Sequence, residues 1–365
     1  MLVAIRDIRF AKGRFALMVT VVAMVTVLIV ILTGLTAGLG ADSTSAIVGL
    51  PADHIAFDTG GSEAGFADSR VSERQWQDWS ATPGVSDAAP VGITQTRVGT
   101  SAGNTHATAV FGVDAASWIA PAAAQGSDLA TAPGAALVSA GLATDLGVGV
   151  GDELALPDGS TAVVGGIGTD ASYGHMPVLW LPLASWQRVA ATQGAVAGTA
   201  TAIALRTHDG VDLADADARI GTTTMATGAA AATIGGFAEE NGSLTMIRMF
   251  LFAISALVVG AFFTVWTVQR RPEIAVLKAL GASTRYLLRD ALAQAAIVLV
   301  LAGAAGGLVG AAIGAAAASV VPFTLDLATV LVPVVVMVGV GIAGAALAVR
   351  RISSVDPLTA LGATR

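Results

Sequence analysis

The sequence has no cysteine and only two lysines, and charged residues make up 12% of its 365 residues. Without cysteine the chain has no disulfide framework, no thiolate metal site and no cysteine nucleophile. The low charge excludes a wholly water-exposed protein, in which about a quarter of the residues are charged. Because 54% of the residues are apolar and the mean hydropathy is +0.74, part of the chain is expected to lie in lipid.

The two lysines also exclude an ATP-binding P-loop in this sequence. That motif needs Gly-Lys followed by Ser or Thr, because the lysine reaches the β and γ phosphates. Lys12 follows Ala11, and Lys278 follows Leu277. Any ATP-driven function is therefore expected to use a separate ATPase subunit.

No set of catalytic nucleophile and base is evident in the sequence. The sequence has four histidines, His54, His106, His175 and His208. No two of them have the i, i+4 spacing of a zinc-protease helix. We expect each histidine to be an isolated surface or packed residue, and the chain not to be an enzyme.

Four long apolar runs predict four membrane helices, at residues 15–39, 246–268, 291–321 and 330–349. Each run is long enough to cross a hydrocarbon core of about 30 Å. The alternative for the first run is a cleaved signal peptide, but the run exceeds the usual apolar region of about 7–15 residues. We therefore expect one span, a large insertion and three further spans.

The charges predict the topology. Residues 42–240 contain 21 acidic residues and six arginines, a net charge of −15, whereas basic clusters flank the apolar runs. The positive-inside rule then places both termini in the cytoplasm and residues 40–245 outside the membrane. The remaining segments are a cytoplasmic amphipathic elbow (1–14), a cytoplasmic loop (269–290), an outer loop (322–329) and a cytoplasmic tail (350–365). The acidic balance argues against nucleic acid as a partner.

The insertion is predicted to be an α+β domain. Alternating runs indicate strands at 107–114 and 176–183 and a hairpin from Glu153 to Gly165 around a Pro-Asp-Gly turn. Helical patches are expected at 72–80 and 183–191, and a loop at 59–65. In the third span, the spacing of Gly306, Gly310 and Gly314 favours close helix packing within the chain, with dimerisation through this face as the alternative.

Three segments resemble the FtsX-like permeases of MacB-type ABC transporters. They are RRPEIAVLKALGAST (270–284), RRISSVDPLTALGATR (350–365) and ALVSAGLATDLGVGVGDELAL (136–156). The resemblance implies a permease homodimer that works with two ATPase subunits of the MacB or LolD type. It also implies a coupling helix, ended by Gly281, in which Arg271, Glu273 and Lys278 face the ATPase. The alternative is an interfacial helix whose cations contact lipid headgroups.

The N-terminal string RDIRFAKGRFALM, followed by LTGLTAGLG, resembles the short DevC-like and HrtB permeases. The HrtB group comprises the membrane subunits of haem efflux pumps in Gram-positive bacteria. This resemblance implies haem as the transported ligand, taken from the membrane between the first and second spans. It also implies the plasma membrane of a Gram-positive, high-GC bacterium, with no intrinsic cofactor.

With no cysteine and no histidine in the spans, methionine sulfur and carboxylate oxygen are the available iron ligands, and arginine suits the propionates. The candidates are Glu239, Glu240, Met246, Arg248 and Met249 near the second span, with Met24 in the first span as a second choice. Iron would be held by Glu240 or Met246, with ligands contributed across the dimer. The plainer interpretation is that the methionines fill apolar space and the acids cap a helix.

Two other functions remain open. Members of the same family export lipids, lipopeptides or antibiotics. The chain could also be a signalling module that resembles cell-division FtsX and activates a hydrolase outside the cell.

Overall fold

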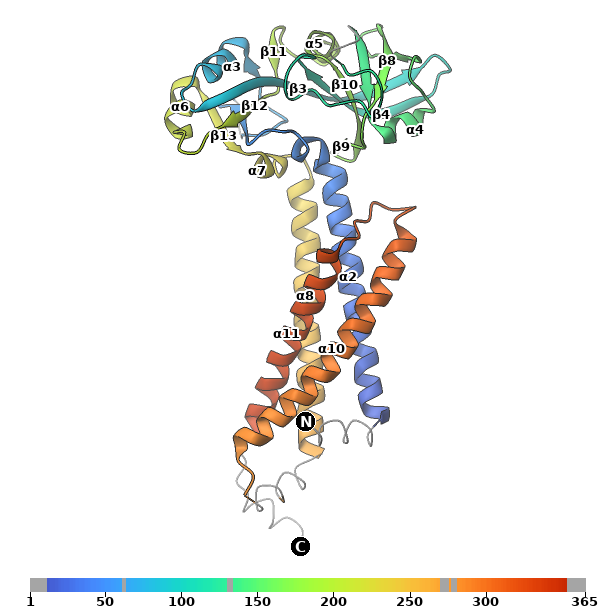
Figure 1. Cartoon of the computed structure of the whole chain (residues 1–365), viewed down its shortest axis with the longest axis vertical. Coiled ribbons are helices and arrows are strands. Elements are labelled where there is room, and N and C mark those ends of the chain that lie inside the picture. Colours follow the sequence, from blue (N-terminus) through green and yellow to red (C-terminus); the bar gives the residue numbers. More distant parts are fainter. Residues whose placement is uncertain (1–11, 61–63, 130–133, 270–275, 277–280, 353–365) are drawn as a thin grey trace. The chain divides into compact units, whose positions relative to one another are not determined.

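The computed structural model describes residues 12–60, 64–129, 134–269, 276 and 281–352. The chain divides into two compact units (Figure 1). The membrane unit comprises Met1–Leu39 and Asn241–Arg365, and the inserted domain comprises Gly40–Glu240. The predicted fold class is confirmed: one apolar helix, an α+β insertion, then three apolar helices.

Four helices in the described part of the chain are long and apolar enough to cross a membrane. They are α2 (Lys12–Val48), α8 (Phe237–Gln269), α10 (Thr284–Ala317) and α11 (Leu327–Ile352). Helix α2 continues past residue 39, and α8 begins before residue 246, so both are longer than the predicted spans. Hydropathy identifies only the apolar part of a helix. The helices themselves extend further, through polar residues such as Asp42 and Glu239.

Small residues let α2 and α10 approach closely. A Cβ atom on Gly306 would lie 2.5 Å from the carbonyl oxygen of Ala23, and one on Gly310 would lie 3.0 Å from Cβ of Val30. The predicted glycine packing is therefore confirmed between these helices. Because the glycines are covered within the chain, dimerisation through this face gains no support.

The loop between α10 and α11 also packs into the contact between α2 and α10. The ring of Phe323 occupies the space left by Gly34 of α2 and Gly314 of α10, and the amide of Thr324 donates to the carbonyl of Gly34 at 3.1 Å. Helix α11 packs against α8, where the hydroxyl of Ser255 contacts the sulfur of Met337 at 3.1 Å. The four helices thus form one packed unit.

The inserted domain is built on a mixed sheet in the order β13-β1-β12-β3-β4-β10-β6-β8-β5. Its long strand β3 (Val85–Thr100) pairs with β12 (Ala202–Thr207) through its first half and with β4 (Thr105–Val113) through its second. One strand therefore runs through both halves of the domain (Figure 1). The other strands are β1 (His54–Asp58), β2 (Val71–Ser72), β5 (Gln125–Gly126), β6 (Ala135–Val138), β7 (Glu153–Ala155), β8 (Thr161–Ile167), β9 (Ser172–Tyr173), β10 (Met176–Pro182), β11 (Thr199–Ala200) and β13 (Thr222–Ala226).

Short helices cover this sheet: α3 (Glu73–Ser80), α4 (Ala140–Leu146), α5 (Leu183–Ala191), α6 (Leu213–Ile220) and α7 (Thr227–Ala231). Local sequence accounts for their ends. In α4 the buried Ser139 accepts from the amide of Leu142, and Gly147 ends the helix at a φ of 68°. The predicted helices at 72–80 and 183–191 and the hairpin after Glu153 are confirmed. Residues 61–63 of the predicted loop lie outside the described residues.

Candidate functional site

The acidic candidates lie in the first turn of α8. Glu239 and Glu240 belong to the helix itself, where carboxylates interact favourably with the positive end of the helix dipole. Met246, Arg248 and Met249 follow on the same helix. The structure therefore places five of the six candidate ligands on one helical segment.

The methionine candidates are open to their surroundings. The exposed fractions are 62% for Met246, 65% for Met249 and 64% for Met24 of α2. By contrast, Met18 on α2 is 3% exposed and belongs to the core of the membrane unit. Arg248 donates from Nη2 to the hydroxyl of Thr245 at 3.0 Å. The candidate sulfurs thus face lipid, a ligand or another chain, and not the core.

A tight hairpin of the inserted domain lies against the final turns of α2. Strands β9 and β10 are joined by Gly174 and His175, whose φ angles of 55° and 62° are both left-handed, as in a type I′ turn. The Gly174 amide donates to the carbonyl of Ser43 at 2.9 Å, and the amide of Ser172 donates to Oγ of Ser45 at 2.9 Å. These bonds hold the turn in place.

The turn brings His175 between two carboxylates. Its Nδ1 lies 2.9 Å from Oδ2 of Asp42 on α2, and its Nε2 lies 3.2 Å from Oε2 of Glu240 on α8. Partial burial lowers the pKa of His175, but hydrogen bonds and charge interactions with the two carboxylates outweigh it and raise the pKa above its usual value. Both ring nitrogens then donate, as in a protonated imidazole.

Sequence reasoning missed these contacts of His175, because its partners are 133 and 65 positions away and no local motif joins them. The histidines themselves do not gather: Nδ1 of His54 contacts Thr207 at 3.1 Å, and Nε2 of His106 lies 3.5 Å from Asp145. Among the described residues, no group of three or more His, Asp or Glu side chains has the arrangement of a metal site.

The ATPase-coupling candidates Arg271, Glu273 and Lys278 lie outside the described residues, as do the elbow at 1–11 and the tail from 353. Gly281 is described, and its φ of 95° lies in the left-handed region that favours glycine. Ser283 caps the next helix, α10, by accepting from the amide of Tyr286.

These features define a class: a multi-pass membrane protein with one helix, an inserted α+β domain and three further helices. Residues 15–223 match the MacB-like periplasmic core domain, and residues 245–357 match the FtsX-like permease C-terminal domain. The chain belongs to the FtsX/MacB family of ABC transporter permeases.

Three relatives illustrate the similarity. The chain is 30% identical over 142 residues to the "Putative hemin transport system permease protein HrtB" of Staphylococcus epidermidis, covering 39% of this chain and 41% of that protein. It is 34% identical over 129 residues to the protein of the same name in Staphylococcus haemolyticus, covering 35% and 37%. An uncharacterised ABC transporter permease of Mycobacterium bovis is 29% identical over 123 residues, covering 33% and 34%. The matches thus span about two fifths or less of these relatives.

Two solved structures are similar to part of this chain. The periplasmic region of MacB from Actinobacillus actinomycetemcomitans covers 52% of this chain and 96% of that chain, with a TM-score of 0.38 and 10% identity. The extracellular domain of the transporter YknZ from Gram-positive bacteria covers 48% and 98%, with a TM-score of 0.35 and 10% identity.

Proposed function

We propose that the chain is the membrane subunit of an ABC-type efflux pump that moves an amphipathic substrate, in the first place haem, out of the membrane. The observation that carries this proposal is the set of exposed thioethers, carboxylates and one arginine along the start of α8. Thioether sulfur binds haem iron, and a guanidinium pairs with carboxylates such as the propionates. The similarity to permeases named for hemin transport favours the same substrate.

The ligand spacing favours a homodimer. Glu239 and Met246 are seven residues apart on a helix, which is about 10 Å along its axis. Metal–ligand bonds are only about 2–2.3 Å long, so two extended side chains would have to bridge most of this distance if one helix supplied both ligands. We therefore propose that one copy contributes Glu239 or Glu240 and the other contributes Met246 or Met249, with Met24 as the second choice. Glu240 would have to exchange its contact with His175 for iron.

We propose that the energy comes from a separate ATPase of the MacB or LolD type, in a complex of two permeases and two ATPases. The segment with Arg271, Glu273, Lys278 and Gly281 would dock on that ATPase. ATP binding would close these segments together, and α8, α10 and α11 would relay the motion. The basic clusters support a plasma-membrane location with both termini in the cytoplasm, and the family resemblance supports a Gram-positive, high-GC source.

Haem titration of the purified full chain tests the proposal. Binding should shift the Soret band, and the combined changes Glu239→Gln and Glu240→Gln, or Met246→Leu and Met249→Leu, should weaken binding about tenfold or more, as expected for loss of an iron ligand. The matched controls are Glu153→Gln, which is exposed on β7, and Met18→Leu, which is buried on α2.

Two outcomes would contradict this proposal. If haem produced no Soret shift, haem would be rejected as the substrate. If the shift persisted in both double variants, the ligand assignment would be wrong. Growth of producing cells under excess haemin, compared with growth under peptide antibiotics, separates haem efflux from antibiotic export.

A further inference from the structure

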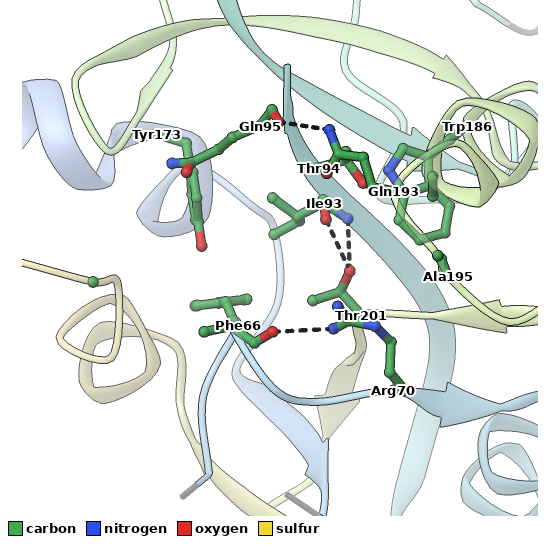
Figure 2. A pocket seen from close by; sticks show the side chains of 14 residues that line it. Phe66, Arg70, Ile93, Thr94, Gln95, Tyr173, Trp186, Gln193, Ala195 and Thr201 are labelled. Atoms are coloured by element: carbon green, nitrogen blue, oxygen red, sulfur yellow. Dashed lines mark hydrogen bonds between the residues drawn. The ribbon is translucent and has the colours of Figure 1, made fainter. Parts of the chain in front are cut away.

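The inserted domain contains a pocket of about 370 Å³ between β3, α5 and the segment before β2 (Figure 2). This volume lies near the lower end of the range of about 300–1,000 Å³ for small-molecule sites. Phe66, Tyr173 and Ile93 supply apolar walls, and Trp186 and Arg70 lie across from Tyr173. The pocket belongs to the inserted domain alone and contains none of the proposed haem ligands.

Arg70 gives the pocket a positive charge. Its Nη1 donates to the carbonyl oxygens of Ala67 at 3.2 Å and Ser69 at 2.6 Å. These two bonds leave Nε and Nη2, the pair of donors that can grip both oxygens of a carboxylate. None of the ion pairs among the described residues includes Arg70.

The rest of the lining does not offset this charge. Among the described residues that line the pocket there is no Asp or Glu. That composition is unusual for this domain, since residues 42–240 contain 21 acids against six arginines. The pocket therefore favours an anionic group over a cationic one.

Trp186 adds an unsatisfied donor to the pocket wall. Its side chain is 2% exposed, and its Nε1 has no hydrogen-bond partner among the described residues. Buried polar groups normally have a partner, so an indole N–H without one marks a position where an acceptor would be stabilised. The N–H is covered, so a bound acceptor reaches it only when the pocket wall shifts slightly.

Two paired glycines of the sheet leave room for this indole ring. Gly92 of β3 and Gly112 of β4 are directly paired, and a Cβ on either would overlap the Trp186 ring. The ring therefore lies against two facing glycines. Nε1 is not among the ring atoms nearest to either glycine.

We propose that this pocket binds a small organic carboxylate with an apolar body. Arg70 would hold the carboxylate, Phe66, Tyr173 and Ile93 would contact the body, and Trp186 N–H would donate to an oxygen of the ligand. The site is separate from the proposed haem site, so its ligand is a second molecule.

Binding of three probes to the full chain tests this site. The probes are 4-phenylbutyrate, 4-phenylbutanol and 4-phenylbutylamine, which share a body but differ in charge. Saturation-transfer NMR should show saturable binding of the carboxylate, and weaker binding of the alcohol and the amine. Arg70→Gln should weaken carboxylate binding about tenfold or more, as for a charged hydrogen bond. Arg74→Gln is the charge-matched control, because Arg74 is exposed on α3 and pairs only loosely with Asp78.

Two tryptophan variants distinguish loss of the indole N–H donor from a general effect on folding. Trp186→Phe should weaken carboxylate binding about threefold or more, the range of one neutral hydrogen bond. Trp79→Phe should leave binding unchanged, although it removes a buried indole whose N–H donates to Thr222 at 3.1 Å. The proposal is overturned if the three probes bind equally, if binding does not saturate, or if Arg70→Gln behaves like Arg74→Gln. Unchanged binding in Trp186→Phe overturns the role of the indole.

Discussion

The contact between α2 and α10 gives a prediction whose size follows from the structure. In Gly306→Ala the new methyl group would lie 2.5 Å from the carbonyl oxygen of Ala23 and 2.7 Å from Cβ of Thr26. Carbon atoms prefer separations of about 3.5–4.0 Å, so the helices must separate by about 1 Å. Overpacking of this kind costs about 1–3 kcal/mol. Alanine is favoured over glycine in a helix by about 1 kcal/mol, which leaves a net loss of up to about 2 kcal/mol.

Thermal unfolding of the purified chain measures this loss. A change of 1 kcal/mol shifts the Tm by about 2–4 °C for units of 150–250 residues, so Gly306→Ala should lower the Tm by several degrees. Gly339→Ala is the matched control, because a Cβ on Gly339 of α11 would meet nothing within 4 Å. The control should keep or raise the Tm. Equal shifts in the two variants would refute the close packing of α2 on α10.

Two further predictions concern the inserted domain. Since the pKa of His175 is raised in the folded protein, its contacts with Asp42 and Glu240 should stabilise the domain at acidic pH and lose this effect as the pH rises through that pKa. His175→Gln should therefore flatten the fall in Tm between about pH 6 and 8, and an unchanged pH profile would contradict the assignment. Ser139→Ala should lower the free energy of unfolding in urea by about 1–2 kcal/mol, because the buried Oγ accepts from the amides of Leu142 and Val178. Ser86→Ala, at an exposed hydroxyl, should cost less than about 0.5 kcal/mol, and equal losses would contradict the role of the cap.

Much of the fold follows from sequence patterns that act locally. Apolar runs predict the membrane helices, because a backbone in lipid must satisfy its own hydrogen bonds. The Pro-Asp-Gly turn predicts the hairpin after Glu153, and it forms with Gly159 at a φ of 81°. The order of strands in the sheet could not be predicted, because pairing such as that of β1 with β12 joins residues about 150 positions apart.

The candidate site was predictable only where it lies on one helix. Glu239 and Met246 are close in sequence, so helical spacing relates them directly. His175 reaches Glu240 through a two-residue turn at the tip of a hairpin, and Arg70 and Trp186 meet at a pocket although 116 positions separate them. Such contacts come from tertiary packing, and local patterns of residues do not predict them.

The facing glycines beneath Trp186 place a constraint on how this family can vary. Neither Gly92 nor Gly112 can gain a side chain while residue 186 remains an indole, since the new atom would occupy the ring's position. The three positions should therefore change together among relatives: a larger residue on either strand should accompany a smaller residue at the position of Trp186. A set of aligned relatives in which the three positions vary independently would show that the ring is held by other contacts.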